Sequence, residues 1–244
     1  MNENTSNDLM PALILAGGLA TRLRPLTEKI PKALIEVAGR PFLWHQIQLL
    51  KRHGIRKVIL SVGYLGEQIE DLYGDGSTLG VSIVYAFDGP VLLGTAGAIR
   101  NALELLPDRF FVLYGDSYLT CDYHAVEQAF RQSGQAGLMT VYRNEGLFDS
   151  SNVEFDGKRI LKYDKTERTP AMHHIDYGLG AFQRSVFASL PAGEKMDLAR
   201  VYQNLLREGR LAAFEVHERF YEIGSSAGLR DTEEFLKASA AESF

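Results

Sequence analysis

Short apolar runs alternate along the first half of the chain with segments whose apolar residues recur at helical spacing. The apolar runs at 13–15, 58–62 and 110–114 are typical of strands buried on both faces, and 81–85 and 138–142 are also extended. This alternation of strand and helix predicts an α/β fold with a mostly parallel central sheet and helices on both faces. The expected helices cover 41–53, which stops at Gly54, and 67–73, 98–106 and 123–132.

The second half changes its pattern, although it contains no linker, repeat or low-complexity stretch. Residues 153–160 predict a hairpin that turns at Asp156-Gly157. Strands are expected at 175–182 and 212–216, and helices at 197–208 and 229–240. We therefore expect a polar tail over 1–10 and a single domain over 11–244, with the second half adding the substrate side of a cleft.

Composition narrows the class of protein. The 244 residues are 45% hydrophobic and 23% charged, as in an ordinary globular protein, and their net charge of −5 argues against a surface that coats nucleic acid. The single cysteine, Cys121, excludes an internal disulfide and a zinc cluster built on cysteines. Because no apolar run approaches a membrane span and residues 1–10 lack the apolar core of a secretory signal, we expect a cytoplasmic protein without membrane contact.

The segment after the first apolar run carries the strongest chemical signal. Gly17 and Gly18 allow backbone N–H groups to approach a phosphate or a base, and Arg22 and Lys32 add positive charge on either side. The spacing fits neither the dinucleotide motif G-x-G-x-x-G nor a Walker A loop. A glycine pair alone is also typical of an ordinary strand-to-helix turn, so the added Thr21-Arg22 and Pro31-Lys32 decide for a triphosphate loop.

Residues 13–32 resemble the signature of the sugar-1-phosphate nucleotidyltransferases, the NDP-sugar pyrophosphorylases, roughly L-A-G-G-x-G-T-R-L-x-P-L-T-x-x-x-P-K. Ala20 stands where that family usually has glycine. The resemblance extends over residues 10–235 and implies a Rossmann-like, GT-A-like single domain. It implies that Arg22 clamps the β- and γ-phosphates and that Lys32 binds phosphates at the reacting centre. The nucleotide-binding residues that it implies in this loop are Leu15, Ala16, Gly17, Gly18 and Thr21.

A second motif, Gly94-Thr95-Ala96-Gly97, has small residues at the expected start of a helix. Such residues permit close approach to a flat ligand, although they also suit a simple helix N-terminus. The run resembles the family's L-G-T-A-G motif, which reads the base and ribose. With Leu93 before it, this form is most similar to guanylyltransferases for D-glycero-D-manno-heptose 1-phosphate or mannose 1-phosphate.

Two carboxylates are candidate metal ligands. Asp116 follows a buried strand, where ligands of open parallel sheets bind, although an aspartate there also commonly caps a turn. Its match to the family's G-D motif implies a Mg²⁺ ligand that also contacts the nucleotide, whereas Asp122 is expected to cap the next helix. Glu222 occupies the place of the aspartate in the family pattern W-x-D-x-G-T, the second ligand, and a carboxylate of either length suits Mg²⁺.

The acceptor side rests on two shorter matches. Asp164-Lys165 resembles the family's Glu-Lys pair, which implies that Lys165 binds the phosphate of the sugar phosphate and Asp164 approaches sugar hydroxyls. As a bare pair, these residues would form a solvated turn. Asp176-Tyr177-Gly178 fall where the family often has Asn-Ala-Gly at the floor of the sugar site, so this chain departs from the family with Asp and Tyr. Gly178 still leaves room for the sugar, and Tyr177 also suits the core. His173 and His174 are expected in a loop and form no catalytic constellation.

The resemblance implies an enzyme that uses Mg²⁺ to convert a nucleoside triphosphate and a sugar 1-phosphate into an NDP-sugar and pyrophosphate. The expected partners are GTP and a heptose or mannose 1-phosphate, and the expected assembly is a homodimer. A uridylyltransferase or cytidylyltransferase is the nearest alternative. A non-catalytic nucleotide-binding module of the same fold is the other alternative, but it predicts loss of charged groups that this chain retains.

Overall fold

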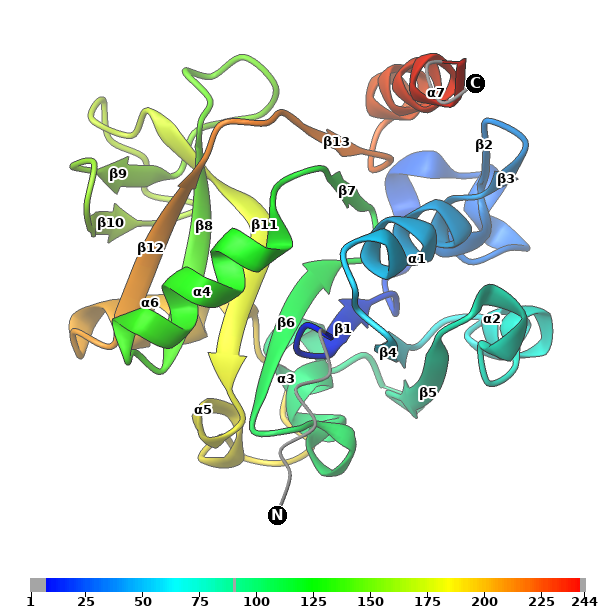
Figure 1. The fold of residues 1–244 in the computed structure, drawn as a ribbon, viewed down its shortest axis with the longest axis horizontal. Helices are drawn as coiled ribbons and strands as arrows, with labels where there is room; N and C mark the ends of the chain where they lie inside the picture. The colour runs from blue at the N-terminus through cyan, green and yellow to red at the C-terminus, as the bar shows by residue number, and fades with distance from the viewer. Residues whose placement is uncertain (1–7, 90, 242–244) are drawn as a thin grey trace.

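The computed structural model describes residues 8–89 and 91–241, so most of the tail expected over 1–10 lies outside the described residues. Its centre is a nine-stranded sheet (Figure 1). The strands are β1 (Ala12–Leu15), β2 (Glu36–Val37), β3 (Arg40–Pro41), β4 (Lys57–Val62), β5 (Ser82–Phe87), β6 (Arg109–Tyr114), β7 (Ser117–Leu119), β8 (Gly137–Arg143), β9 (Val153–Phe155), β10 (Ile160–Tyr163), β11 (His174–Gln183), β12 (Leu211–Val216) and β13 (Phe220–Glu222). The helices are α1 (Phe42–Arg52), α2 (Glu67–Tyr73), α3 (Gly94–Asn101), α4 (Tyr123–Ser133), α5 (Ser185–Ala188), α6 (Leu198–Arg207) and α7 (Ser226–Ala241).

The sheet is parallel in its first half and mixed in its second. Strands β5, β4, β1 and β6 lie side by side in parallel, so their carboxyl ends meet at one edge. The long strand β11 then runs antiparallel to β6 and to β8, and β12 adds to β8 in parallel. The hairpin β9–β10 joins the sheet through β9, which pairs with the start of β11 at His174, on the side of β11 opposite to β8. The predicted fold class is confirmed, and the antiparallel strands come from the half whose pattern changes in the sequence.

Helices cover both faces of this sheet. In β1, Ala12 and Ile14 pack with α1, α2 and α4, whereas Leu13 packs on the opposite side with α3, α5 and α6. Since strand residues alternate between faces, each apolar run supplies two cores at once, which is why apolar residues occupy nearly all of its positions. Within the described residues, no helix is both long and apolar enough to span a bilayer.

A third, smaller apolar cluster holds the C-terminal segment against the first half of the chain. It joins Phe42 of α1, Tyr118 of β7, Leu236 of α7 and Ile223, which follows β13, and all four residues are buried. β13 pairs antiparallel with β7, and Glu222 lies opposite Ser117. Residues more than 100 positions apart in the sequence therefore become neighbours at the end of β6.

Most expected elements are present, and three expectations need correction. The helix expected over 98–106 begins earlier, at Gly94, and ends at Asn101, after which Leu103–Leu105 form a 3₁₀ turn. The hairpin turns at Asp156-Gly157 as predicted, but its second strand runs on to Tyr163. The expectation that His174 lies in a loop is wrong, because this residue begins β11 and is buried.

Candidate active site at the carboxyl edge of the sheet

The glycine pair lies where β1 ends among its neighbours. The Ala16 N–H donates to Ser61 O at the end of β4 (2.8 Å), and the Gly115 N–H after β6 donates to Leu15 O (2.9 Å). A Cβ on Gly17 would lie 3.1 Å from the nitrogen of Gly63, so glycine keeps two chain segments in close contact. Gly18, in contrast, has nothing within 4 Å of a Cβ, which leaves its backbone open to a ligand.

The turn after the glycines presents Arg22. Ala20 adopts a left-handed conformation (φ 46°), which favours glycine. This conformation explains why the family usually has glycine at this position. Thr27 is buried and donates from its hydroxyl to Ala20 O (2.9 Å), which holds this backbone in place. The 3₁₀ turn Thr21–Leu23 follows, and its Arg22 is exposed. A long cation is thus held on a short, fixed turn beside the glycine loop.

Lys32, Asp116 and Glu222 converge on one point beside Gly224. Lys32 Nζ lies 2.6 Å from Asp116 Oδ2. A Cβ placed on Gly224 would lie 2.5 Å from Glu222 Oε2, 3.2 Å from Lys32 Nζ and 3.5 Å from Asp116 Oδ2. The structure therefore brings together a cation and two carboxylates that come from three distant segments, and only glycine at 224 leaves room between them.

Hydrogen bonds fix both carboxylates. Asp116 Oδ1 accepts from the Ser117 hydroxyl (3.3 Å), and Asp116 O accepts from the Ile223 N–H (2.9 Å), which ties the end of β6 to the end of β13. Glu222 Oε1 accepts from the Ser225 hydroxyl (2.8 Å), and its Oε2 accepts from the Gly224 N–H. The predicted capping role of Asp122 is confirmed, because its carboxylate accepts from two N–H groups of α4 and is not part of this group.

This donor set fits a magnesium ion that is completed by substrate. In the described part of the chain no cluster of three or more histidine, cysteine or carboxylate side chains could hold a metal. Asp116 and Glu222 offer two carboxylates on one side, and Mg²⁺ commonly takes one or two carboxylates together with substrate phosphates and water. The metal roles of both residues stay predictions.

The acceptor-side residues lie next to the same strand end. Lys165 Nζ lies 5.4 Å from the centroid of the Tyr114 ring, over the last residue of β6. Gly178 has φ +100°, and its Cβ would lie 3.5 Å from Tyr114 and 3.7 Å from the Ser117 hydroxyl. Lys165 and Gly178 therefore lie beside Tyr114, the last residue of the strand that precedes Asp116.

Two residues assigned to the sugar phosphate are engaged elsewhere. Asp164 Oδ1 accepts from the N–H groups of Thr166 and Glu167, so its carboxylate shapes the loop that carries Lys165. Tyr177 is 2% exposed, and its ring packs edge-on against Phe220 in the core. This burial is at odds with direct sugar contact by Tyr177 and agrees with the alternative interpretation of it as a core residue.

The small residues at 94–97 serve a packing role. The N–H groups of Ala96 and Gly97 donate to Met196 O (2.9 and 3.3 Å), and the Thr95 hydroxyl accepts from the Leu198 N–H (2.6 Å). A Cβ on Gly97 would lie 2.6 Å from a backbone oxygen at position 194. The segment before α6 thus occupies part of this helix start, and the nucleotide-binding role of 94–97 stays a prediction.

Comparison with known proteins identifies the family of this chain. A family model described as nucleotidyl transferase matches residues 11–237. The chain belongs to the nucleotidyl transferase family. It is 32% identical to N-acetylmuramate alpha-1-phosphate uridylyltransferase of Neisseria meningitidis, over 92% of this chain and 97% of that protein. It is 31% identical to the mannose-1-phosphate guanylyltransferase catalytic subunit beta of Danio rerio, over 88% of this chain and 61% of that protein.

The match to longer relatives is partial. The chain is 32% identical to UTP–glucose-1-phosphate uridylyltransferase of Synechocystis, over 78% of this chain and 53% of that protein. It therefore spans little more than half the length of two of these curated relatives. The structure of HddC from Yersinia pseudotuberculosis with GMP-PN has a TM-score of 0.77 at 23% identity, over 93% of this chain and all of that one. This structural likeness supports the fold described above for this chain.

Two partly buried carboxylates of this nucleotidyl transferase domain were not among the predicted site residues. Asp88 follows β5, and its Oδ2 lies 3.3 Å from the position of a Cβ on Gly17. Oδ1 is buried and has no hydrogen-bond partner among the described residues. Burial raises the pKa of Asp88 to about 6, although the nearby Leu93 N–H and Ser61 hydroxyl act in the opposite direction. Only its place at the end of a strand could have signalled this residue.

The other missed carboxylate, Asp176, lies beneath Lys165. Its Oδ2 accepts from the Tyr163 hydroxyl (3.2 Å), and its Oδ1 accepts from the Gly178 N–H (3.1 Å). Burial raises the pKa of Asp176, and the positive charge of Lys165 opposes that rise. The substitution of Asp for the family's Asn at this position was the available signal.

Proposed function

We propose that this protein transfers a nucleoside monophosphate from a nucleoside triphosphate to a sugar 1-phosphate, releasing pyrophosphate. The observation that carries the proposal is the convergence of Lys32, Asp116 and Glu222 around Gly224, next to an open glycine loop. A cation and two carboxylates at the carboxyl edge of a parallel sheet suit a triphosphate with its metal ion.

The proposed reaction needs charge and position more than proton transfer. The attacking group is a phosphate oxygen, which is already ionised at neutral pH, so no general base is required. Lys32 and Arg22 would offset the charge that develops on the α-phosphoryl group and on the leaving pyrophosphate. Lys165 would hold the acceptor phosphate against the mutual repulsion of two anions. Mg²⁺, held by Asp116 and Glu222, would supply further positive charge to the phosphates.

Asp88 supports GTP as the nucleotide. Guanine presents two adjacent donors, N1–H and the N2 amino group, which a single carboxylate accepts together. Uracil presents only one such donor, N3–H, between two carbonyl acceptors, which an ionised carboxylate repels. Because burial raises the pKa of Asp88 only to about 6, its side chain is ionised at neutral pH, and its Oδ2 atom, which faces Gly17, would accept from the base. A uridylyltransferase is the alternative, and two of the relatives carry that name.

For the acceptor we propose a heptose or mannose 1-phosphate, bound between Lys165 and Gly178. Asp176 accepts from the Gly178 N–H and interacts with Lys165, and its carboxylate would also accept from a sugar hydroxyl. A cytoplasmic location and a homodimer remain part of the proposal. A binding module without activity is disfavoured by the retention of Arg22, Lys32, Asp116, Lys165 and Glu222.

The decisive experiment is a panel of ATP, GTP, CTP and UTP against mannose, glucose, heptose and N-acetylmuramate 1-phosphates, read as pyrophosphate release. We expect turnover with GTP and a mannose-type acceptor. Absence of pyrophosphate from every pair would leave the binding module as the function. Exclusive use of UTP would refute the guanine assignment while leaving the reaction class intact.

Asp88→Asn separates base choice from catalysis in the same assay. Asparagine keeps the shape but carries no negative charge, so we expect the KM for GTP to rise by about 10-fold or more, the size of effect of losing a charged hydrogen bond. The turnover number at saturating GTP should change little. An unchanged KM for GTP in this variant would exclude Asp88 from base recognition.

A further inference from the structure

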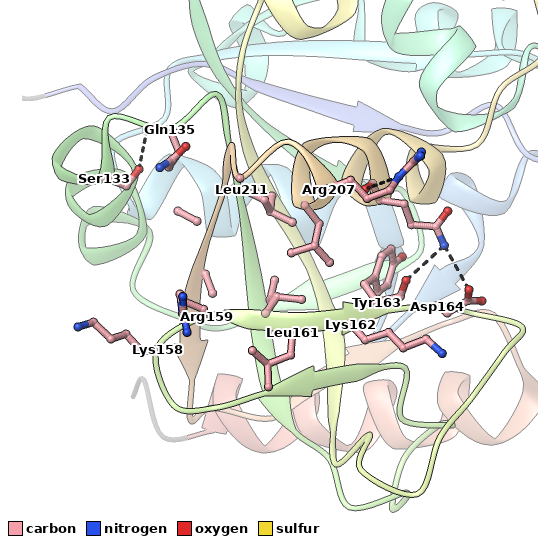
Figure 2. Close-up of a pocket in the computed structure, with 16 residues that line it drawn as sticks. Ser133, Gln135, Lys158, Arg159, Leu161, Lys162, Tyr163, Asp164, Arg207 and Leu211 are labelled. Carbon is pink, nitrogen blue, oxygen red and sulfur yellow. Dashed lines mark hydrogen bonds between the residues drawn. The ribbon is translucent and has the colours of Figure 1, made fainter.

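A large hollow lies away from the catalytic edge, between β10, α6 and β12. Its volume is about 960 Å³, which is at the upper end for ligand pockets, and we call it the hairpin groove (Figure 2). Its lining contains none of the residues assigned to nucleotide or metal, and of the residues assigned to the sugar phosphate it contains only Asp164. Residues from the β9–β10 turn and β10, from α6, from β12 and from the end of α4 line it.

Two of its walls are strand edges. Within the described residues, β10 pairs only with β9 and β12 pairs only with β8, so each strand has an unpaired side. The groove contacts the consecutive residues Leu211, Ala212 and Ala213 of β12. Because consecutive strand residues point to opposite faces, contact with all three means that the strand presents its edge to the groove. Unpaired N–H and C=O groups on such an edge are a template for another extended chain.

The groove is basic although the chain as a whole is acidic. Its lining carries four cations, Lys158, Arg159, Lys162 and Arg207, and one carboxylate, Asp164. The whole chain has a net charge of −5. Figure 2 shows Lys158 and Arg159 on one side of the groove and Lys162 on the other. An acidic ligand would therefore be attracted to this groove more than to the rest of the surface.

These charges are weakly compensated by the described residues. Arg159 has only a long contact, 3.7 Å, with Asp156 of its own turn. Arg207 donates to the Asn204 side chain and to Gln203 O, both of them uncharged groups. Asp164 already accepts from the N–H groups of its own loop. The cations are thus available to a carboxylate from outside.

The floor between the cations is apolar. Leu161 is 56% exposed, and Leu206 and Leu211 are partly exposed beside it. Exposed leucine side chains can accommodate the apolar residues of an extended peptide in which apolar and charged residues alternate. A phosphate ester would use the cations but neither the strand edge nor the leucines.

From these features we propose that the hairpin groove binds a short acidic segment of a partner polypeptide in extended conformation. The segment pairs through its backbone with the edge of β12, places apolar side chains on Leu161 and Leu206, and directs its carboxylates to Lys158, Arg159 and Arg207. Because β10 continues directly into Asp164 and Lys165, the bound segment lies close to the strand that leads to the acceptor-side lysine. The proposal does not depend on the proposed activity.

The test is a displayed library of random nine-residue peptides, selected on the full chain and counter-selected on Lys158→Glu/Arg159→Glu/Arg207→Glu. We expect enriched sequences that alternate acidic and apolar residues. A control variant, Lys57→Glu/Arg109→Glu, changes exposed charges at the starts of β4 and β6 and should retain every selected peptide. Absence of groove-dependent peptides, or enrichment of peptides without acidic residues, overturns the proposal.

Fluorescence anisotropy with a fluorescein-labelled Glu-Leu-Glu-Leu-Glu-Leu peptide gives the second measurement. Binding should weaken by at least about tenfold in the groove variant, as expected when partners of charge pairs are reversed. N-methylation of alternate peptide nitrogens should also weaken it, whereas circular dichroism should show the variant to be folded. Equal binding of the N-methylated peptide overturns strand pairing. Binding of pyrophosphate in place of any peptide, or a change of oligomeric state in the groove variant, assigns the groove to a small anion or to a second copy and also overturns the proposal.

Discussion

Ionisation of Asp88 destabilises the folded chain, and Asp88→Asn should reveal this as a pH-dependent gain in stability. Burial raises the pKa of Asp88 from 3.8 to about 6, and its Oδ1 atom has no hydrogen-bond partner in the part of the chain that the structure describes. A shift of about two pKa units corresponds to about 3 kcal/mol between the two protonation states. Because the side chain is only partly buried, we expect a net effect of about 1–2 kcal/mol.

The direction follows from the order of the two pKa values. Below pH 3.8 both the folded and the unfolded chain carry the proton, so the penalty is absent. As the pH rises to about 6, the unfolded chain ionises freely while the folded chain resists, and the wild type loses stability. Asparagine does not titrate, so the free energy of unfolding of the variant relative to wild type should rise across this window.

The assay is urea unfolding of both proteins, without nucleotide, at pH 4 and at pH 7.5. The difference should be larger at pH 7.5 by about 1–2 kcal/mol, or about 2–8 °C in the melting temperature. Asp71→Asn makes the same chemical change at an exposed position of α2 and serves as the control. A difference that is flat across the two pH values, or larger at pH 4, would refute the assignment of Asp88 as a carboxylate whose ionisation is opposed by burial.

Three further predictions concern single side chains. Gly224→Ala places a methyl group 2.5 Å from Glu222 Oε2 and should lower turnover by about 100-fold through displacement of the site, with an unchanged circular dichroism spectrum; near-normal turnover would contradict the crowding. Lys32→Ala should abolish most pyrophosphate release while leaving urea unfolding close to wild type, and an active variant would remove Lys32 from the mechanism. Thr140→Val removes the buried hydroxyl that donates to Leu179 O (2.5 Å) and should lower the free energy of unfolding by about 1–2 kcal/mol, whereas Thr140→Ser, which keeps the donor, should lose less.

Local pattern predicted the fold well because strand and helix periodicity follows directly from burial on one or two faces. The run at 13–15 and the helix at 67–73 are examples that needed no tertiary information. The start of α3 at Gly94 was missed because its first turn consists of small residues without an apolar stripe, and its N–H groups are paired by Met196 instead. The long antiparallel strand β11 was recognised as extended, but its partners were not, since pairing is set by distant segments.

The sequence by itself determined the order of strands and helices, the glycine loop with Arg22 and Lys32, and the carboxylate that follows β6. Those features depend on residue types within a few positions of one another. Only the tertiary structure decided that Glu222 reaches Asp116, because the pairing of β13 with β7 joins segments more than 100 residues apart. It also decided the burial of Asp88 and Tyr177 and the basic groove beside β12, since burial depends on packing of the whole chain.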